Sequence, residues 1–561
     1  MKKPLLLLCI IISINSLAQN LLWEKTFLNS SIYDSISANS IAVDAFGNIY
    51  TAGLCSSATM DFDPGPGVFN LGGSGHSETY ISKLDASGNF VWARTMGGTG
   101  TDGNTYLILD NSNNIYIVDN GWYGTVGITI SKLDASGNII WSKLIANSPP
   151  SSAVYFGHKS KSIAIDLLGN LYITGCFTGT IDFNPGAAVN NITCGTSVVE
   201  TFLLKLNNLG DFSWVKQYNT NQLDNPSTSV SIDSLGGIFL SGSFQGTTDF
   251  NPNAGIFNLT AIGAKDIFIT KLNASGTLKW AKSMGGTNDD ILYATAIDKS
   301  GNVYSTGYFS GIVDFNPGIA INNLSSMVGS SDIYISKLDS LGNYVWAKNF
   351  TGVYNDFSFS LALDKHKNIY TTGCYSGTVD FNPNAGVFNL SSLSTTPDIY
   401  ISKIDSSGNF INALTFPGTA SGKAFGITTD INDNIFLTGD LGGYAITGTT
   451  DFDPGVGVLN VTTNGYALFV MKMENSTTGI STINNNLNEI NIYPNPANLF
   501  LTINTILNYN EIRIINSLGQ LMLKQGNSNT VNTSSLEKGI YFIQLFNDKG
   551  KLLSTKKFVK E

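Results

Sequence analysis

The sequence predicts an all-β protein: a seven-bladed β-propeller with four-stranded antiparallel blades, followed by a small C-terminal β-sandwich. A unit of four β-rich runs recurs seven times between residues 21 and 475, which indicates an array of supersecondary units. Gly (58 residues) and aromatic residues (11%) are abundant, whereas charged residues make up only 13%. This composition is typical of short strands joined by tight turns. No window shows sustained apolar spacing at helical intervals, so we expect almost no helix after the leader.

Residues 1–18 predict a secretory signal peptide. Lys2 and Lys3 form a positive end, Leu5–Ile12 is an apolar run, and small residues up to Ala18 form a cleavage site. The apolar run is too short to span a bilayer, and no other stretch is long and apolar enough. We therefore expect no transmembrane segment in the mature chain.

Each repeat unit opens with a β-hairpin, as in Ile41–Gly53, where two β-rich runs flank a turn. An Asp side chain accepts a backbone N–H inside this turn, and Gly supplies the positive φ that closes it. The anchor aspartates are separated by 66, 56, 67, 65, 66 and 66 residues, so only the second unit is short: Asp44, Asp110, Asp166, Asp233, Asp298, Asp364 and Asp430.

A second hairpin, around Asp85–Asn89 in the first unit, ends in a strand that carries Trp92. Four strands in two hairpins predict a propeller blade. The seventh copy stops at Met473 before its Trp segment, and the missing segment lies at the other end of the chain, at Leu21–Lys25. We expect the strand of Trp23 to complete the last blade and close the ring. The alternative, an open solenoid, would need capping units.

Three motifs of the unit carry a family resemblance. They are Asp-x-x-Gly-Asn-x-Tyr-x-Thr-Gly, then Asp-Phe-Asx-Pro, then Lys-Leu-Asp-x-x-Gly-Asn-x-x-Trp. The units resemble the SBBP-type β-propeller repeat of secreted bacterial proteins over roughly residues 21–475. The resemblance implies the fold and carries no catalytic residues, and we assign the propeller to residues 19–475.

The C-terminal part of the chain predicts a separate module. Residues 476–488 are rich in Ser, Thr and Asn and predict a linker. Alternating runs in residues 489–561 predict a β-sandwich with strands at Leu499–Ile503, Glu511–Ile515, Leu521–Lys524, Gly539–Leu545 and Leu552–Val559.

Short motifs in this module carry a second resemblance. With the order and spacing of its motifs, the module resembles the type A C-terminal sorting domain of the Bacteroidetes type IX secretion system. The resemblance implies Sec export to the periplasm, then passage across the outer membrane by the type IX machinery with removal of the tail. The product would be secreted or held at the outer cell surface. The sorting residues are Tyr493, Pro494, Asn495, Pro496, Gly519, Gly539, Tyr541, Lys556 and Lys557.

The charge distribution excludes some partners. Residues 19–483 hold 21 Lys and Arg against 36 Asp and Glu, a net charge of −15, and Arg94 is the only arginine among them. Residues 484–561 hold 8 against 5, a net charge of +3. An acidic, arginine-poor surface argues against nucleic acid as a partner.

Two repeated polar motifs have a structural and a functional interpretation. Asp61 with Asp63, and Asp451 with Asp453, offer paired oxygens for Ca²⁺; the structural alternative is that the Asp caps a turn while Phe packs between blades. We expect no other cofactor. One Lys recurs on the third strand of all seven units, either as a cationic ring for an acidic ligand or with its stem laid over the sheet: Lys83, Lys132, Lys205, Lys271, Lys337, Lys403 and Lys472.

The repeated Trp residues are interpreted as packing between blades, so a carbohydrate-stacking site should use aromatic residues outside the repeat pattern. The candidates lie in long segments on the face opposite the hairpins, where a glycan or a surface protein would bind: Trp122, Tyr123, Tyr155, Phe156 and Tyr354. Among the cysteines, Cys176 and Cys194 share a unit and form the one pair for which a disulfide is considered.

The sequence favours a secreted or cell-surface binding or structural module. Catalysis has little support, because the three histidines His76, His158 and His366 form no paired motif and no nucleophile elbow is present. The alternative is an extracellular polysaccharide-acting enzyme, a hydrolase or lyase, with two carboxylates at the mouth of the channel.

Overall fold

The computed structural model divides the chain into two compact units, Met1–Thr477 and Thr478–Glu561. The described residues contain strands and no helix, which confirms the all-β prediction. The predicted signal peptide and linker lie outside the described residues. The structure describes residues 20–28, 36–55, 59–72, 78–96, 102–121, 127–146, 153–155, 162–194, 199–222, 228–393, 396–443, 447–455, 457–475, 491–505, 509–516, 520–548 and 552–561.

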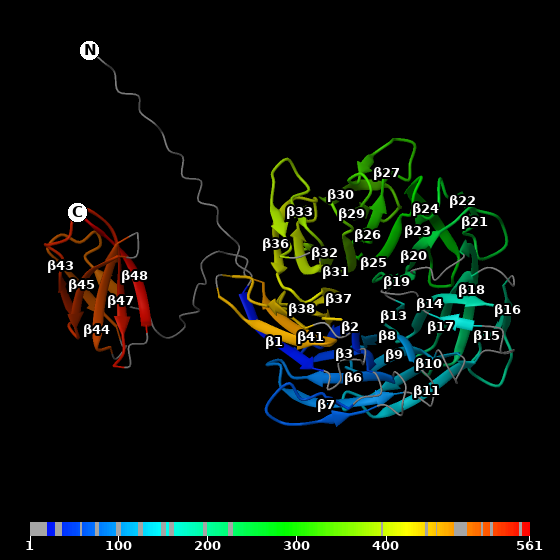
Figure 1. Ribbon diagram of the computed structural model, residues 1–561, viewed down its shortest axis with the longest axis horizontal. Coiled ribbons are helices and arrows are strands. Elements are labelled where there is room, and N and C mark those ends of the chain that lie inside the picture. Colours follow the sequence, from blue (N-terminus) through cyan, green and yellow to red (C-terminus); the bar gives the residue numbers. More distant parts are fainter. Residues whose placement is uncertain are drawn as a thin grey trace, which may run out of the picture. The chain divides into compact units, whose positions relative to one another are not determined.

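Among its described residues, the first unit contains seven antiparallel sheets in which four strands follow one another; Figure 1 shows how they are arranged. They are named sheets 1 to 7, and each is given from its innermost to its outermost strand. Sheet 1 is β2 (Ile36–Val43), β3 (Ile49–Cys55), β6 (Glu78–Leu84) and β7 (Phe90–Met96); sheet 2 is β8 (Asp102–Leu109), β9 (Ile115–Gly121), β10 (Gly127–Leu133) and β11 (Ile139–Ala146); sheet 3 is β13 (Ile163–Ile165), β14 (Leu171–Thr178), β17 (Val199–Leu206) and β18 (Phe212–Gln222), with β12 (Ala153–Tyr155) also on β14.

The remaining sheets follow the same order. Sheet 4 is β19 (Thr228–Ile232), β20 (Ile238–Phe244), β23 (Asp266–Leu272) and β24 (Leu278–Gly286); sheet 5 is β25 (Ile291–Ile297), β26 (Val303–Ser310), β29 (Ser331–Leu338) and β30 (Tyr344–Gly352); sheet 6 is β31 (Phe357–Leu363), β32 (Ile369–Tyr375), β35 (Asp398–Ile404) and β36 (Phe410–Phe416); sheet 7 is β37 (Gly422–Thr429), β38 (Ile435–Leu441), β41 (Ala467–Glu474) and β1 (Asn20–Leu28).

The outermost strand of sheet 7 comes from the other end of the unit. β1 pairs antiparallel with β41, with Trp23 opposite Lys472 and Thr26 opposite Phe469. This pairing confirms the prediction that the N-terminal strand completes the last sheet. It also covers the edge that β41 would otherwise expose.

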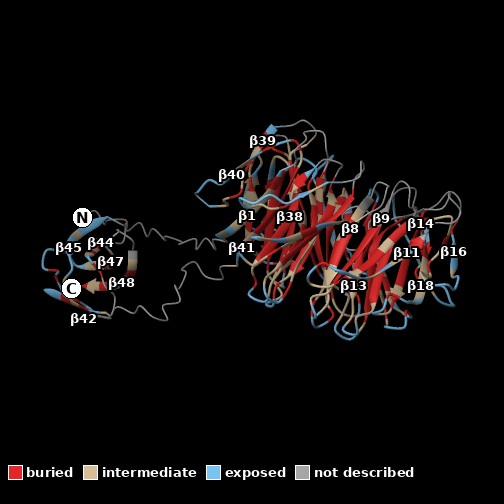
Figure 2. Ribbon diagram, turned by 90° about the horizontal axis from the view of Figure 1, so that it is seen from below, coloured by how far each residue is buried: buried red, intermediate tan, exposed pale blue. Residues whose placement is uncertain are grey.

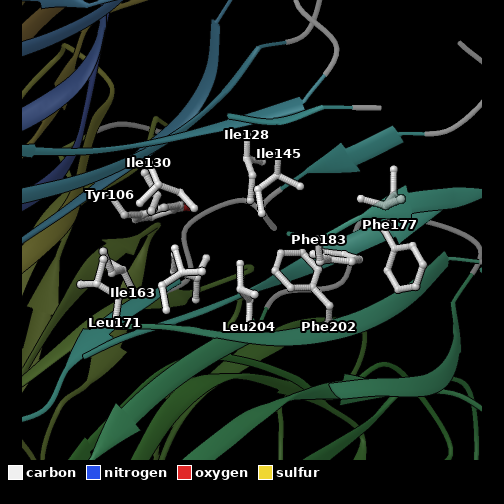
Figure 3. Packing of buried hydrophobic residues seen from close by; sticks show 14 of the residues in the cluster. Tyr106, Ile128, Ile130, Ile145, Ile163, Leu171, Phe177, Phe183, Phe202 and Leu204 are labelled. Carbon is white, nitrogen blue, oxygen red and sulfur yellow. The ribbon is translucent and has the colours of Figure 1, made fainter. Parts of the chain in front are cut away.

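Neighbouring sheets pack against one another in a propeller-like arrangement. The innermost strands contact each other in chain order, and β37 contacts β2 (Figure 1). Hydrophobic clusters join each sheet to the next, and one of them joins sheet 7 to sheet 1 through Phe436, Leu468 and Phe62. Figure 3 shows the cluster between sheets 2 and 3, where Phe202 and Ile128 point into the space between the sheets. Burial is therefore concentrated between the sheets, while the turns are exposed (Figure 2).

Six sheets carry an extra two-stranded hairpin between their second and third strands. The hairpins of sheets 5 and 6 pair with the outermost strand of the preceding sheet, as in the pairing of Gly285 with Asp314. Such pairing protects an exposed sheet edge. The hairpins are β4 (Met60–Asp61) with β5 (Asn70–Leu71), β15 (Thr180–Asp182) with β16 (Asn191–Thr193), β21 (Thr247–Asp249) with β22 (Asn258–Thr260), β27 (Ile312–Asp314) with β28 (Asn323–Ser325), β33 (Thr378–Asp380) with β34 (Asn389–Ser391), and β39 (Thr447–Asp451) with β40 (Asn460–Asn464).

The second unit contains two antiparallel sheets around one hydrophobic core. The core takes Leu501 and Val531 from one sheet and Ile514 and Ile543 from the other. The five predicted strands are confirmed to within two residues, and two short ones are added. The three-stranded sheet is β42 (Asn491–Tyr493), β43 (Phe500–Asn504) and β46 (Thr530–Asn532); the four-stranded sheet is β45 (Leu521–Gly526), β44 (Glu511–Asn516), β47 (Gly539–Phe546) and β48 (Leu552–Lys560).

Candidate functional site

The anchor aspartates of the repeat have a structural role in their turns. In the first copy, Asp44 Oδ1 accepts N–H bonds from Phe46 and Asn48, each at 2.9 Å. Its Oδ2 accepts from Asn48 Nδ2 at 2.8 Å and from Tyr50 Oη at 3.2 Å. The same four contacts recur at Asp110, Asp166, Asp298 and Asp364. Because these carboxylates already hold their own hairpins, they are poor candidates for ligand binding.

The repeated Trp residues pack on the next sheet, as predicted. A Cβ added to Gly137 in sheet 2 would lie 3.1 Å from the ring of Trp92 in sheet 1. The Trp92 indole also donates to Ala135 O of the same turn at 3.3 Å. In the same way Trp23 lies against Gly88 of sheet 1, so the contact continues across the junction of the two chain ends. The other pairs are Trp141 with Gly210, Trp214 with Gly276, Trp280 with Gly342, and Trp346 with Gly408.

Sheet 6 carries Asn412 where the other sheets carry Trp. The structure gives a reason: the next sheet is sheet 7, whose two outer strands, β41 and β1, belong to the two ends of the unit. No turn therefore connects these strands for an indole to cover. The Trp is absent at the junction where its partner turn is also absent.

Most of the repeated Lys residues reach the neighbouring sheet, whereas Lys132 and Lys271 pair with Asp110 and Asp233 of their own sheets. Each Nζ lies 4.6–5.2 Å from the centre of a Tyr or Phe ring on the adjacent strand. Lys83 donates to Ala135 O in sheet 2 at 3.2 Å, and Lys472 of sheet 7 donates to Ala86 O in sheet 1 at 3.3 Å. These contacts support the structural interpretation, in which the Lys stem lies over the sheet.

The Asp-Phe-Asx-Pro motif caps a turn and fills a space between sheets. Asp61 Oδ1 accepts N–H bonds from Asp63 at 3.0 Å and Phe69 at 2.8 Å, and Asp451 makes the equivalent bonds to Asp453 and Leu459. The described residues contain no group of three His, Cys, Asp or Glu placed to hold a metal ion. The hydrogen bonds of Asp61, Asp63, Asp451 and Asp453 show a turn-capping role. Calcium binding at these residues stays a prediction.

The Phe of this motif packs across the junction between neighbouring sheets. The ring of Phe62 in sheet 1 lies 6.1 Å from Phe27 in sheet 7 and 4.9 Å from Tyr80 in its own sheet. Phe62 is fully buried. These contacts confirm the predicted packing role of the motif.

Two pairs of carboxyl groups are buried at the junctions of sheets 4 to 6. Asp290 and Asp356 are fully buried in the segments that precede β25 and β31, and each lies near the first carboxyl of the preceding third strand, Asp266 or Asp332. Burial, reinforced by the neighbouring carboxyl, raises the pKa of Asp290 and of Asp356 to about 8. Burial alone raises the pKa of Asp266 and of Asp332 to about 6. Their burial also keeps a substrate away from them.

A cavity lies on the axis of the first unit, between the innermost strands. Its wall includes Asn39 of β2, Tyr106 of β8, Ile163 of β13, Phe359 of β31 and Phe425 of β37. The cavity has a volume of about 120 Å³ and opens to solvent. It is the place where residues from most of the sheets meet.

β-Bulges in three innermost strands place side chains at the wall of this cavity. The pairing with the second strand shifts by one residue at Asn39, Phe359 and Phe425, which line the cavity, and also at Tyr293, which does not. A bulge turns a side chain out of the regular alternation and is frequent beside functional sites. The bulge also brings the backbone close to a Gly on the second strand: a Cβ on Gly373 would lie 1.9 Å from Phe357 O. Ser37 O and Ile291 O approach Gly53 and Gly307 in the same way, so these bulged sheets leave no space for a side chain at that position.

Aromatic rings extend from the cavity wall through sheets 5 to 7. Phe359 lies 5.3 Å from Phe425 and 5.4 Å from Tyr293. Phe357 stacks on Phe359 at 6.0 Å, and Tyr308 meets Phe357 edge-on at 5.2 Å. The strand next to β37 adds a polar group: Asn39 of β2, whose buried Nδ2 has no hydrogen-bond partner among the described residues. The cavity wall therefore places an aromatic surface on a strand that neighbours one with an unused donor.

The structure describes only some of the predicted ligand-binding aromatic residues. Trp122, Tyr123 and Phe156 lie outside the described residues, and Tyr155 is described only as part of β12. Tyr354 is 53% exposed, and its ring lies over Gly377, where an added Cβ would be 2.7 Å from it. Their role in binding stays a prediction.

Sequence reasoning missed the axial aromatic residues. A usable signal was present at the fifth residue before each anchor Asp, which is Tyr293, Phe359 and Phe425 in units 5 to 7 but polar in units 1 to 4. The aromatic residues predicted to bind a ligand were instead those of long segments between the repeated runs. Cys176 and Cys194 are not joined by a disulfide; Cys194 Sγ lies 3.5 Å from Phe177 O as a donor.

The predicted sorting segment of residues 493–496 follows β42 and lies beside the last strand. Tyr493, Pro494, Asn495 and Pro496 are exposed, and both prolines follow cis peptide bonds. Asn495 Oδ1 accepts the Val559 N–H at 2.9 Å, which ties this segment to the last strand. Of the other predicted sorting residues, Tyr541 stacks on Phe558 with ring centres 5.7 Å apart, and Gly539 is the first residue of β47. Lys556 and Lys557 are exposed, and Gly519 lies outside the described residues.

Comparison with known proteins gives one curated relative and several solved structures. The uncharacterized WD repeat-containing protein L264 of Acanthamoeba polyphaga mimivirus is 27% identical over 445 residues, which cover 67% of this chain and 32% of the viral protein. The chain therefore spans about a third of the length of that relative. The viral protein is uncharacterized, so it adds no activity to the account.

Two of the similar structures are viral proteins. The phage phi92 endosialidase is 11% identical, with 96% of this chain and 87% of that chain covered and a TM-score of 0.37. A subtype N10 neuraminidase-like protein of A/little yellow-shouldered bat/Guatemala/060/2010 is 8% identical, with 81% and 98% covered and a TM-score of 0.34. Both TM-scores are below 0.5, so neither likeness carries an argument about function here.

The C-terminal unit gives a specific match. Residues 491–561 match the family described as "Secretion system C-terminal sorting domain". None of the described residues belongs to a helix with the length and hydropathy of a membrane span. The chain is therefore an all-β protein whose C-terminal domain directs export to the cell surface or the extracellular space.

Proposed function

We propose that the chain is an SBBP-type, closed seven-bladed β-propeller that acts as a binding or structural module outside the cell. A signal peptide removed after Ala18 and the Sec pathway would bring it to the periplasm. The type IX system would then recognise the C-terminal β-sandwich and carry the propeller outward. The matched sorting domain supports the route, and the continuous series of hydrophobic clusters between sheets supports the ring.

The observation that carries the binding role is the difference between repeated and unrepeated residues. The repeated Asp, Lys and Trp side chains already contact turns and neighbouring sheets. The axial cavity is lined instead by residues that change from sheet to sheet, such as Asn39, Tyr106 and Phe425. A cavity with a few polar groups among apolar walls is the usual form of a ligand site.

The competing proposal is a polysaccharide-acting hydrolase or lyase. The paired carboxyls at Asp266 and Asp290, and at Asp332 and Asp356, are at most 1% exposed and are closed to a polysaccharide. A glycan array and a turnover screen on the same polysaccharides separate the two functions. We expect binding without products; turnover that disappears when one acidic residue is changed to its amide would overturn the binding-module proposal.

Deletion of residues 491–561 tests the export route. We expect the truncated protein to stay in the periplasm, because the segment that matches the sorting family is missing. Cell fractionation and surface labelling measure the outcome, with the full chain as the control. Normal arrival of the truncated protein at the surface would refute the sorting role.

A further inference from the structure

The axial cavity has a chemical character that narrows its ligand. None of the described residues that line it carries a charge. The one arginine of the first unit, Arg94, lies on an outermost strand and donates to Asn138 Oδ1 at 3.1 Å. Carboxylate and phosphate groups are recognised best by the fork of an arginine. The described wall therefore suits an uncharged ligand.

The aromatic side of the cavity supplies a stacking surface. The bulge places Phe425 at the cavity wall, where it is partly exposed, and the buried Phe359 of the same wall packs against it with ring centres 5.3 Å apart. The face of an aromatic ring carries negative charge and attracts polarised C–H groups as well as apolar surface. A pyranose ring presents such a face of C–H groups.

The neighbouring strand β2 supplies a hydrogen-bond donor. Asn39 Nδ2 is buried and has no acceptor among the described residues. A buried amide donor without an acceptor is unfavourable, so a bound hydroxyl oxygen would stabilise this site. An uncharged ligand with an apolar face and hydroxyl oxygens on its edge satisfies both residues at once.

We infer that the axial cavity binds a neutral saccharide, with a pyranose ring stacked on Phe425 and a hydroxyl oxygen accepting from Asn39 Nδ2. This inference rests on the proposed binding function and names its ligand class. Tyr354 lies on a segment between strands and is not part of this cavity wall. The two sites are therefore separable by mutation.

The test is calorimetric titration of the full chain with neutral trisaccharides of glucose, mannose, galactose and N-acetylglucosamine. Sialyllactose and trigalacturonate serve as acidic comparators, and product analysis of each mixture checks for turnover. We expect at least one neutral trisaccharide to bind, the acidic ones not to bind, and no products to form.

Variants assign the binding to the cavity. Loss of a stacked ring is worth about 0.5–1.5 kcal/mol beyond burial, so we expect Phe425→Ala to weaken binding roughly tenfold. Phe425→Leu keeps an apolar side chain of similar bulk without an aromatic face and should weaken binding as well, which covers the case in which Phe425→Ala fails to fold. Asn39→Ala should weaken binding several-fold. Phe46→Ala is the matched control, because Phe46 is 76% exposed in a turn at the far end of β2.

The outcomes separate the inference from the function on which it rests. Binding of a neutral trisaccharide that survives both Phe425 variants would overturn the cavity as the site and leave the binding module standing. Binding of acidic saccharides alone would overturn the ligand class. The absence of any saccharide binding would overturn the inference, and formation of products would overturn the proposed function itself.

Discussion

The outer part of each sheet and its innermost strand differ in how they use the repeat. On the outer strands the same Trp-on-Gly and Lys-on-carbonyl contacts recur from sheet to sheet and continue from sheet 7 to sheet 1. On the innermost strands the bulged residue is Asn39 in sheet 1 but Tyr293, Phe359 and Phe425 in sheets 5 to 7. Identical residues in this chain therefore hold neighbouring sheets together, while variable residues line the cavity on the axis.

The largest break in the outer contacts should come from removal of β1. Deleting Asn20–Leu28 exposes the edge of β41 and removes the Trp23 contact with Gly88. We expect loss of cooperative unfolding, because the cluster that joins sheets 7 and 1 loses one of its strands.

Circular dichroism during heating measures this effect. A synthetic peptide of residues 20–28 added to the truncated protein is the control and should restore part of the transition. A truncated protein that melts at the same temperature as the full chain would contradict the account of the junction.

The buried carboxyl pairs should make stability depend on pH. Asp290 and Asp356 have a folded pKa of about 8, far above the value of about 3.9 for an exposed Asp. The folded state therefore keeps protons that the unfolded chain releases, and the free energy of unfolding falls as the pH rises from about 4 to about 8. Above that range the loss is complete, and it amounts to a few kcal/mol for each group, as an order of magnitude.

Replacing Asp290 and Asp356 by Asn tests whether the free energy of unfolding falls as the pH rises. The double variant D290N/D356N should unfold at a higher temperature than the wild type at pH 8, and its melting temperature should change less between pH 5 and pH 8. Hydrogen bonds lower the pKa values of the turn aspartates Asp298, Asp339 and Asp405. Both proteins should therefore still lose stability in acid. An equal change of melting temperature between pH 5 and pH 8 in the wild type and the double variant would contradict the raised pKa values of Asp290 and Asp356.

A single outer contact should matter less than the junction. Trp346→Ala removes an indole that is 8% exposed and lies against Gly408 of the next sheet. We expect destabilisation of about 3 kcal/mol, the usual cost of truncating a buried Trp. Asn412→Ala, at the equivalent position of sheet 6, is the matched control and should cost less than about 0.5 kcal/mol. Equal effects in chemical denaturation would show that the position carries no special contact.

The turn caps should give the smallest effect. Asp451→Ala removes a carboxylate that accepts two backbone N–H bonds and should cost about 1 kcal/mol, as for other caps. Asp451→Asn keeps an acceptor and should cost less. Both variants are melted with and without Ca²⁺. A rise in melting temperature with Ca²⁺ that Asp451→Asn abolishes would make the motif a calcium site and contradict a purely capping role.

The sequence predicted the repeated part of the molecule well, because repetition reports local chemistry. The Asp and Gly of each hairpin define a turn whose hydrogen bonds lie within five residues, so Asp44 and its copies could be interpreted without coordinates. The split copy around Trp23 likewise predicted a pairing between chain ends, and β1 lies on β41 as expected. The sorting domain could be predicted for the same reason, as a local order of motifs, and residues 491–561 match that family.

The axial site could not be predicted in the same way. Phe359 and Phe425 lie in strands that read as regular β alternation, and only the bulge, a property of the pairing with the next strand, directs them toward the cavity. The carboxyl pairs were missed for a related reason. Asp266 and Asp290 are separated along the chain and become neighbours only when the third strand of sheet 4 meets the segment before sheet 5.

The most direct test of the central claim is one melting experiment on Trp346→Ala and Phe425→Ala, each with and without the neutral trisaccharide that the wild type binds. If repeated residues hold the sheets and variable residues bind, Trp346→Ala melts at a lower temperature than the wild type and is still stabilised by the saccharide. Phe425→Ala is then no longer stabilised by the saccharide, whatever its own melting temperature. A Phe425→Ala protein that is stabilised as much as the wild type, or a Trp346→Ala protein that keeps its melting temperature, would contradict the claim.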